Sequence, residues 1–469
     1  MKWEKLLSVQ RQRMGYGRQG SGSKDLRSEF EKDYHRIIGS ASFRRLQDKT
    51  QVFPLDKSDF IRTRLTHSLE VSSFGKSLGQ NIGEYILAYH KDPDFTADMK
   101  EDICNVLQCA GLIHDIGNPP FGHFGETAIR EWFQKNLSVL EYKGKKAEEI
   151  LLPQMKADFL HFEGNAQALR LVTKLHYLVD ENGMNLTYAL LNTIVKYPVS
   201  SLEIGTTEDI RSKKMGYYYA DRELFSEIEQ ETGTNGRRHP LTFILEAADD
   251  LAYKTADVED AFIKGFLSYY QLREELKKLD EKYVTFPFDA LGSLDRKYQR
   301  ALGNGVSNPE EYAVKNWIVQ VQSYLINCVT EGFTTHYAEI MEGTYQKDLF
   351  AGTDAEPLME LLGELACRYV FTSSAIYRME VTEAGIIDKL MDLFMRAAVK
   401  YDTDEVLDSI DERMIAFISD NYKNAYRCHA KGKDEAEKLY LRLLLVTDYI
   451  CGMTDSYAKR LYQELNGIL

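Results

Sequence analysis

The chain has 469 residues, 44% of them hydrophobic, and a formal net charge of −14 at pH 7. A chain of this length can bury a sizeable core without disulfides, and its acidic balance argues against a surface that binds nucleic acid as a whole. An acidic protein can still bind polyphosphate where a metal and a local cluster of Arg and Lys overcome the background field.

The distribution of apolar residues and cysteines indicates the cellular compartment of the protein. The sequence has no run of eighteen apolar residues and no apolar segment after Met1, so we expect neither a membrane span nor a secretory signal. The six cysteines are scattered and form no CxxC pair, which indicates reduced, mostly buried thiols. We therefore expect a cytoplasmic protein.

The chain opens with a lead segment, residues 1 to 26, which contains a Gly/Ser-rich turn at 18 to 23. Residues 27 to 47 have a helical pattern rich in arginine, and residues 51 to 54 form an extended break. The next helix begins near Arg62. Its apolar residues predict a face toward the core that consists of Leu69, Phe74, Leu78, Ile82, Tyr85 and Ile86.

His67 lies in the first turn of this helix, beside Arg62 and Arg64. A helix start with two arginines is either an anion site or a solvated basic turn, and the pattern favours neither.

A second segment combines a His-Asp pair with two helix-breaking features. The periodicity of residues 103 to 113 predicts a buried helix, and Gly117 with two following prolines ends it, so we expect His114 and Asp115 on its last turn. One imidazole and one carboxylate suit a divalent metal. Such a pair alone is more often a capped helix end with a satisfied histidine, so the hypothesis depends on further ligands. His123 and Glu126 follow, three positions apart.

The middle of the chain offers further polar groups. Residues 162 to 167 begin a helix with side chains suited to capping or bracing. Lys196 stands at a helix end, where it is more often a favourable charge than a phosphate contact. Residues 200 to 238 change in composition and are interpreted as a mobile insertion or lid.

A helix that starts at Pro240 carries the next candidate. Asp249, Tyr253 and Asp257 recur every four residues, so they share one face of it. Two acids and a tyrosine beside an apolar face suit the wall of a site, although a solvated acidic face is the alternative. Asp250 is not excluded as the acid that acts. From 258 onward the pattern stays helical, and the role of a polar run at 447 to 457 is not identified.

Taken together, His67, His114, Asp115 and Asp249 lie on different predicted helices. Two imidazoles and two carboxylates fill four positions of a five- or six-coordinate divalent ion and leave room for water and a substrate oxygen. Mn²⁺ and Mg²⁺ are the first choices, and Fe, Co, Ni or Zn also suit the set. Arginines and Lys196 would offset phosphate charge, and His123 held by Glu126 would act as general acid or base.

The pattern H…HD…D, carried by these four residues, resembles that of the HD-domain phosphohydrolases. More narrowly, the chain resembles the bacterial deoxyguanosine triphosphate triphosphohydrolases. The stretches that carry this resemblance are residues 43–53, 64–71, 114–126 (HDIGNPPFGHFGE), 162–167 (FEGNAQ), 246–253 (EAADDLAY) and 452–455. They run through almost the whole chain in the expected order.

The resemblance implies an all-α fold with an HD-domain core at 27 to 270 and a large helical extension at 271 to 469. The extension is expected to complete the substrate pocket and to form oligomer contacts. The implied reaction is metal-dependent hydrolysis of a dNTP, dGTP first, to the deoxynucleoside and intact inorganic triphosphate by attack of water at the α-phosphate. Family members are commonly homo-oligomers, often hexamers, and some respond to nucleotides or single-stranded DNA at separate sites.

The resemblance also assigns roles to residues. His67, His114, Asp115 and Asp249 bind the metal, His123 is the catalytic histidine, and Glu126 orients it. The substrate contacts are Arg64, Lys196 and Tyr253 on the triphosphate, and Gln51 and Asp257 on the 3′-hydroxyl of the deoxyribose. Tyr253 would also pack against the sugar and exclude a 2′-hydroxyl.

Two other functions remain open from the sequence. One is a different HD phosphohydrolase, such as a nucleoside monophosphatase or a cyclic-nucleotide phosphodiesterase, which gives no reason for Arg64, Lys196 and the His123–Glu126 pair. The other is a non-catalytic nucleotide or nucleic-acid sensor on an HD scaffold, which loss of a metal ligand or of His123 would favour. A zincin-type protease is not indicated, since no His-Glu-x-x-His occurs.

Overall fold

The computed structural model describes residues 1–13, 25–53, 62–89, 91–176, 180–206, 209–283 and 287–468. These residues are mainly helical, and their one sheet is a two-stranded antiparallel hairpin of β1 (Glu141–Tyr142) and β2 (Lys145–Lys146). The all-α prediction is confirmed. The Gly/Ser-rich turn expected at 18 to 23, Pro54 of the extended break, and residues 207 and 208 of the expected insertion lie outside the described residues.

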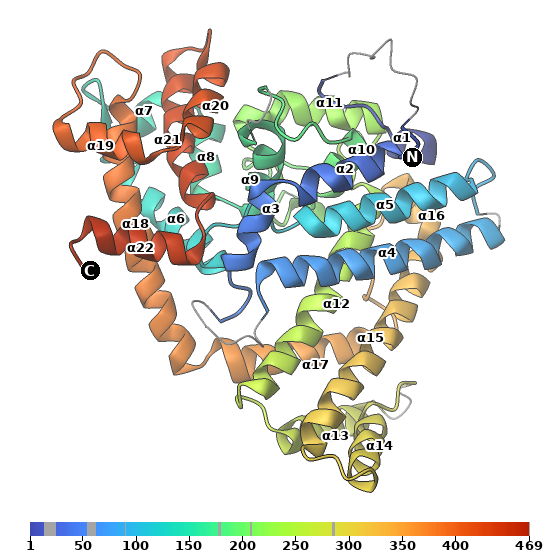
Figure 1. The fold of residues 1–469 in the computed structure, drawn as a ribbon. Coiled ribbons are helices and arrows are strands. Elements are labelled where there is room, and N and C mark those ends of the chain that lie inside the picture. The colour runs from blue at the N-terminus through green and yellow to red at the C-terminus, as the bar shows by residue number, and fades with distance from the viewer. Residues whose placement is uncertain are drawn as a thin grey trace.

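Residues 1 to 263 supply twelve of the described α-helices, whose arrangement is drawn in Figure 1. They are α1 (Trp3–Leu6), α2 (Glu29–Ile38), α3 (Ala41–Arg45), α4 (Arg64–Ala88), α5 (Ala97–Ile113), α6 (Gly122–Asn136), α7 (Ala147–Ile150), α8 (Pro153–Leu160), α9 (Gly164–Arg170), α10 (Tyr188–Thr193), α11 (Arg222–Thr232) and α12 (Pro240–Ile263). Short 3₁₀ helices lie at Leu46–Asp48, Ile210–Ser212 and Tyr219–Asp221, and a π-helical turn lies at Leu171–Leu175.

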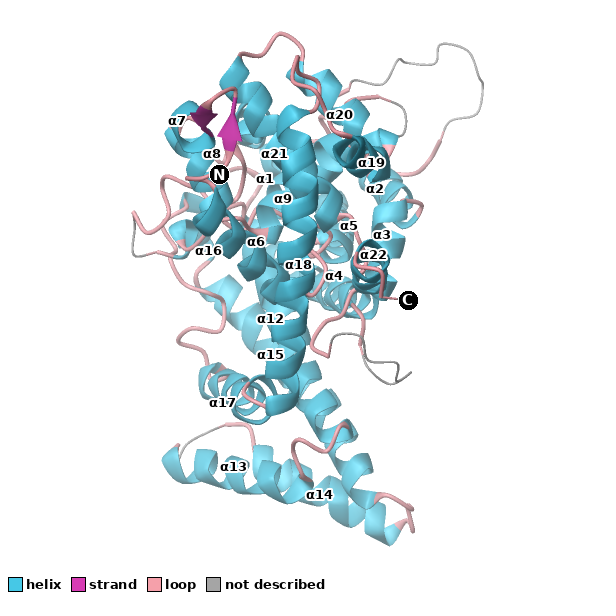
Figure 2. Cartoon of the chain, turned by 90° about the vertical axis from the view of Figure 1, so that its left-hand side faces the viewer, coloured by secondary structure: helices cyan, strands magenta, loops and turns pink. Residues whose placement is uncertain are grey.

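The second half supplies ten more within the described ranges. They are α13 (Tyr269–Lys282), α14 (Ala290–Gly303), α15 (Pro309–Thr335), α16 (Tyr337–Glu342), α17 (Glu356–Ala366), α18 (Ser374–Lys400), α19 (Ser409–Phe417), α20 (Asp420–Ala430), α21 (Glu435–Cys451) and α22 (Asp455–Leu465). A π-helical turn at Cys367–Phe371 joins α17 to α18. Figure 2 shows α13 and α14 as a pair at one end of the molecule, away from α19 and α20.

The helices α4 and α5 lie side by side and pack against α12 (Figure 1). Thr63 caps α4 by accepting a hydrogen bond from the backbone of Thr66, and Pro240 opens α12 as predicted. Leu78 and Ile82 of α4 are fully buried, as expected, but Leu69 is 50% exposed, so its place in the core face was wrong. Leu69 lies two residues, or roughly 200° of helix rotation, beyond the buried His67, and therefore points away from the core.

The segment from 200 to 238 is packed into the protein along its described part. It holds two of the 3₁₀ helices and α11, and Met215 and Tyr218 are fully buried. Its mobility stays a prediction, as do the domain limits 27 to 270 and 271 to 469. Among the described residues, no helix combines the length and apolar character that a membrane crossing needs. Four of the six cysteines are buried and all are free.

The polar run at 447 to 457 joins the C-terminal helices to the first half of the chain. Asp448 on α21 accepts hydrogen bonds from Arg170 (2.7 Å to its Nη2) and Gln167 (2.9 Å) of α9. Asp455 at the start of α22 accepts bonds from the backbone N–H groups of Thr50 and Phe121, each at 2.9 Å. Asp448 thus anchors α9, and Asp455 anchors the loops that contain Thr50 and Phe121. No local sequence pattern could indicate these roles.

We predict that Asp448→Ala lowers the free energy of unfolding by about 3–5 kcal/mol, because it leaves the buried Arg170 guanidinium with only its longer ion pair to Asp221, at 3.9 Å. Asp404→Ala is the matched control, since Asp404 is 82% exposed where it pairs with Lys143, and it should leave the stability nearly unchanged. Urea unfolding followed by circular dichroism measures both. Equal stability of the two variants would contradict the bracing role of Asp448.

Candidate active site

A cavity of about 590 Å³ opens between α4, α6, α12 and the segment that contains residues 209–221. Its size falls within the range of about 300–1,000 Å³ that is common for small-molecule sites. The lining residues are Gln51, Val52, Arg64, Asp115, Asn118, His123, Asn165, Lys196, Tyr197, Ile210, Lys213, Lys214, Glu246, Asp249, Asp250, Tyr253, Lys254, Asp257, Asp348 and Phe371. Eight of the eleven residues predicted from the sequence are in this wall, and His67, His114 and Glu126 are buried beside it.

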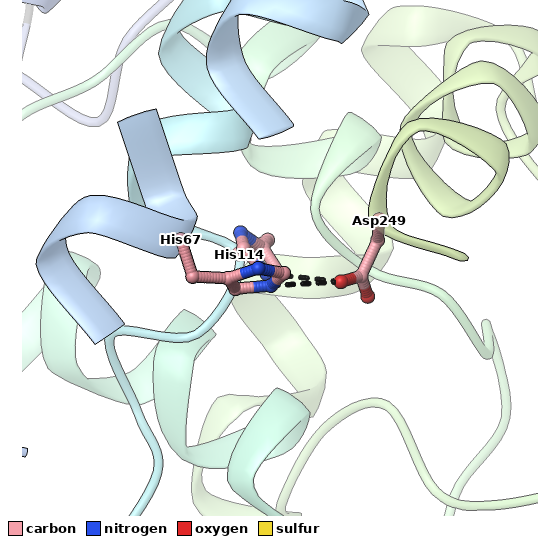
Figure 3. Close-up of side chains that lie close together, drawn as sticks. All are labelled: His67, His114 and Asp249. Carbon is pink, nitrogen blue, oxygen red and sulfur yellow. Dashed lines mark hydrogen bonds and ion pairs between the residues drawn. The ribbon is translucent and has the colours of Figure 1, made fainter. Parts of the chain in front are cut away.

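His67, His114 and Asp249 converge from three helices (Figure 3). Each offers one ligand atom, and these atoms lie within 4.8 Å of one another. Asp249 Oδ1 lies 3.1 Å from His67 Nε2 and 3.4 Å from His114 Nε2. Both imidazoles are buried, at 0% and 2% exposure, so their orientation is fixed by packing. This geometry can hold a divalent cation.

The close approach of α4 and α5 brings the two imidazoles together. Gly111 lies one turn before His114, and Ser72 lies just over one turn after His67. A Cβ atom at Gly111 would stand 2.5 Å from the backbone of Ser72, a distance that real Cβ atoms do not adopt. Only glycine therefore allows the helices to pack this closely.

The hydrogen bonds around His114 define which of its nitrogens faces the cluster. Its Nδ1 lies 2.8 Å from the backbone oxygen of Gly111, to which it donates, so Nε2 is directed at Asp249. Burial lowers the pKa of His114, but the nearby carboxylates of Asp115 and Asp249 outweigh it, and the pKa is raised above the ordinary value.

Asp249 is shared between the imidazoles and a cation. Its Oδ2 accepts a hydrogen bond from Lys196 Nζ at 2.7 Å. Burial raises the pKa of Asp249, but the charge of Lys196 and the imidazoles more than offset it, so the pKa lies well below the ordinary value. Asp250 points to another part of the wall, where burial raises its pKa to about 7. The structure thus brings Asp249, and not Asp250, to the histidines.

Asp115 lies at the edge of this cluster. The helix α5 ends at Ile113, so His114 is its C-cap and Asp115 lies in the turn that follows. The sequence had predicted both residues on the last turn of the helix itself. Asp115 Oδ1 is 3.7 Å from His114 Nε2, while Oδ2 forms an ion pair with Arg64. Burial raises the pKa of Asp115, but the Arg64 guanidinium and the two imidazoles together outweigh this and hold the pKa well below its ordinary range.

His123 and Glu126 form a pair on the first turns of α6. His123 Nδ1 lies 3.0 Å from Glu126 Oε2, and 76% of the His123 side chain is exposed, toward the cavity, whereas Glu126 is buried. The hydrogen bond to Glu126 and the charge of that carboxylate raise the pKa of His123. Burial raises the pKa of Glu126, but the hydrogen bond and charge of His123, the charge of Lys214 and the backbone N–H of Gly164 together outweigh it and lower the pKa.

Glu126 is itself held by the start of α9. Its Oε1 accepts a hydrogen bond from the backbone N–H of Gly164 at 2.8 Å. A Cβ at Gly164 would lie 2.6 Å from that oxygen and 2.1 Å from Asn118 Oδ1. The FEGNAQ stretch therefore supplies a glycine whose backbone N–H contacts Glu126 without a side chain in between. This role is more specific than the bracing that the sequence predicted for the stretch.

The remaining predicted contacts line the same cavity. Tyr253 and Asp257 follow Asp249 along one face of α12, as the four-residue spacing predicted. Burial and the charge of Asp260 raise the pKa of Asp257 to about 8, so this side chain carries a proton at neutral pH. Gln51 Oε1 is buried and has no hydrogen-bond partner among the described residues.

Several lining residues escaped the sequence analysis. Lys213 and Lys214 come from the irregular segment after 209, and Asp348 and Phe371 come from the C-terminal half. Lys214 Nζ lies 3.0 Å from the buried carboxylate of Glu163. The adjacent lysines were a usable signal, since paired cations in a glycine- and tyrosine-rich segment suit an anionic ligand. No local pattern marks Asp348 or Phe371.

Comparison with known proteins places these residues in a family. The model of the HD domain matches residues 64–190, which include both histidines of the cluster, and that of the phosphohydrolase-associated domain matches residues 351–464. A deoxyguanosinetriphosphate triphosphohydrolase-like protein of Listeria monocytogenes is 49% identical over the full length of both chains, and one of a Synechocystis species is 34% identical over both. A deoxyguanosinetriphosphate triphosphohydrolase of Yersinia enterocolitica is 32% identical over 99% of this chain and 98% of its own length. The chain therefore belongs to the HD-domain deoxyguanosinetriphosphate triphosphohydrolase family of hydrolases.

Proposed function

We propose that the protein hydrolyses deoxynucleoside triphosphates, dGTP first, to the deoxynucleoside and intact inorganic triphosphate, with a divalent metal as cofactor. The observation that carries this proposal is the meeting of three groups in one cavity of about 590 Å³. These groups are the His67–His114–Asp249 cluster, the His123–Glu126 pair and the cations Arg64 and Lys196. The names of the relatives support dGTP as the nucleotide.

The cluster fits a divalent metal. His114 Nε2, which is directed at Asp249, is a buried nitrogen without a hydrogen-bond partner among the described residues, and such an atom is costly unless a ligand uses it. We assign His67, His114, Asp115 and Asp249 as the residues that would hold the ion. Asp115 now pairs with Arg64 and would be available as a ligand if Arg64 paired with substrate instead. A metal held there would polarise a phosphoryl oxygen and lower the pKa of bound water. Imidazole and carboxylate suit Mn²⁺ or Mg²⁺ among several ions.

The cations and polar groups of the wall suit the rest of the nucleotide. Arg64 and Lys196 are each paired with an acid that faces the metal position, so both can transfer to phosphate oxygens without moving far. Gln51 Oε1, which lacks a partner, would accept a hydrogen bond from the 3′-hydroxyl of deoxyribose. Protonated Asp257 would complete that contact, and Tyr253 would pack on the sugar.

His123 is placed to supply the proton that the leaving group needs. In the proposed step, the oxygen of water bonds to the α-phosphorus and the bond from that phosphorus to O5′ breaks. O5′ then takes a proton from His123. The proton released by the attacking water reprotonates His123. Glu126 keeps the imidazole oriented and raises its pKa, which favours the protonated form that the leaving group needs.

The direct test is a panel in which the purified protein and Mn²⁺ or Mg²⁺ meet each of the four dNTPs and GTP. We expect inorganic triphosphate and the deoxynucleoside, resolved by ion-exchange chromatography, with dGTP turned over fastest and GTP spared. Orthophosphate or pyrophosphate as the product would instead indicate another phosphohydrolase activity. Turnover only in mixtures of dNTPs would reveal an activating nucleotide, and no turnover would favour a sensor.

The metal assignment is tested by Asp249→Ala with Asp250→Ala as the neighbouring control. Loss of a group that merely supports a ligand costs about 10- to 100-fold in metal affinity, so loss of Asp249 should cost about 100-fold or more. Asp250→Ala should bind metal as the unaltered protein does. The metal content of each variant after dialysis, measured by mass spectrometry, shows which of the two carboxylates binds the metal. Full occupancy in Asp249→Ala would move the ligand to Asp250.

The role of His123 predicts a loss of turnover and a shift in pH dependence. His123→Ala should keep its metal but lower kcat by roughly 10²–10⁴-fold. A protonated His123 is required, so activity falls as pH rises through its pKa. Because Glu126 raises that pKa, Glu126→Gln should move the fall in kcat/KM to lower pH. Near-normal turnover of His123→Ala, or an unmoved pH profile in Glu126→Gln, would refute the assignment.

A further inference from the structure

Asn118 brings an unused hydrogen-bond donor to the wall of the candidate active-site cavity. The residue is only 4% exposed and lines the cavity, and its amide nitrogen Nδ2 is buried without a hydrogen-bond partner among the described residues. A buried donor of this kind destabilises a folded protein unless a ligand or water supplies the acceptor. Neither the metal cluster nor the His123–Glu126 pair uses it.

The backbone of Asn118 is held in place by its neighbours. Its N–H donates to the carbonyl oxygen of Asp115 at 3.2 Å, and its own carbonyl oxygen accepts a hydrogen bond from Lys49 Nζ at 2.5 Å. A Cβ atom at Gly117 would lie 2.2 Å from the backbone nitrogen of Ala168, so this turn lies directly on α9. The fold therefore positions Asn118 through its backbone, and its side chain is not needed for that purpose.

The Asn118 side chain borders the group that orients His123. A Cβ atom at Gly164 would lie 2.1 Å from Asn118 Oδ1 and 2.6 Å from Glu126 Oε1, so the amide and the carboxylate meet at the same glycine. Through its backbone, Asn118 also contacts Asp115, which lies at the edge of the metal cluster. Asn118 thus lies where the proposed metal position and the His123–Glu126 pair adjoin.

We propose that Asn118 Nδ2 donates a hydrogen bond to a non-bridging oxygen of the α-phosphate and is a further catalytic residue. The inference rests on the proposed function, in which water attacks the α-phosphorus beside the metal and His123. A donor that the fold fixes in advance stabilises negative charge on this oxygen during the attack without reorganisation. An amide suits the position because it is uncharged and does not compete with His123 for a proton.

The first measurement compares hydrolysis of dGTP by the unaltered protein and by Asn118→Ala. Loss of one such donor should lower kcat by roughly 10²–10³-fold. Metal content and pH profile should stay unchanged, because the metal ligands and the His123–Glu126 pair remain. Near-normal turnover would overturn the proposal. So would a pH profile shifted as in Glu126→Gln, since the amide would then act through Glu126.

Asn118→Ala should keep its fold, because Nδ2 gives up no hydrogen bond to the described protein. Circular dichroism checks this. Asn118→Asp, which has the same shape but no amide donor, replaces it in both measurements if the alanine variant does not fold.

The second measurement identifies the contact itself. In dGTP, sulfur can replace either non-bridging oxygen of the α-phosphate, and sulfur accepts hydrogen bonds weakly. In the unaltered protein, sulfur at the oxygen that contacts Asn118 should lower kcat/KM relative to dGTP, with the same metal in every assay. In Asn118→Ala this ratio of dGTP to thio-substituted dGTP should shrink by roughly tenfold, which lies within the range of coupling between groups in contact.

Gln51→Ala is the matched control, because Gln51 is a second amide in the cavity wall that is assigned to the sugar. It should slow hydrolysis of both nucleotides together and leave their ratio unchanged. An unchanged ratio in Asn118→Ala, or an equal change of the ratio in Gln51→Ala, would overturn the proposal. Failure of the proposed function is seen separately, as absence of turnover of every dNTP by the unaltered protein.

Discussion

The carboxylate of Asp249 is the contact on which the site depends. One of its oxygens faces the imidazoles of His67 and His114, and the other accepts a hydrogen bond from Lys196. This single side chain thereby links α4, the end of α5, α12 and the loop after α10. Its negative charge is balanced within the protein by Lys196. A metal bound there would compete with Lys196 for the carboxylate of Asp249. Lys196 would then be free to pair with phosphate.

Around this centre, backbone contacts and distant carboxylates fix the groups that we propose to be catalytic. Glu126 accepts a hydrogen bond from the backbone N–H of Gly164, the first residue of α9. Asp448, far along the chain, holds the other end of α9 through Arg170. Asp455 clamps the loops of Thr50 and Phe121 on either side of the site. The C-terminal helices therefore support the site mechanically, and the C-terminal half also contributes Asp348 and Phe371 to its wall. Preorganisation of this kind lets a few polar groups act in a fixed geometry.

Much of this arrangement could be predicted from the sequence, because helical periodicity is a strong local signal. The buried faces of α5 and α12 and the shared face of Asp249, Tyr253 and Asp257 follow directly from spacing. The prediction for Leu69 was wrong because it placed all apolar residues of α4 on one face. The rotation of the helix directs Leu69 toward solvent instead.

What the sequence could not provide are contacts between segments far apart along the chain. The partners of Asp448 and Asp455 lie more than 270 residues away, so no local pattern identifies them. Lys213 and Lys214 come from a segment without periodicity, where only the fold shows that they face the cavity. Likewise, Gly164 could be recognised as a contact only once Glu126 was seen against it.

The most direct test of the central claim is hydrolysis of dGTP in water enriched in ¹⁸O, with both products analysed by mass spectrometry. Attack of water at the α-phosphorus predicts one labelled oxygen in intact inorganic triphosphate and none in deoxyguanosine. Label in the 5′-hydroxyl of deoxyguanosine, or in orthophosphate or pyrophosphate, would contradict this account of the site.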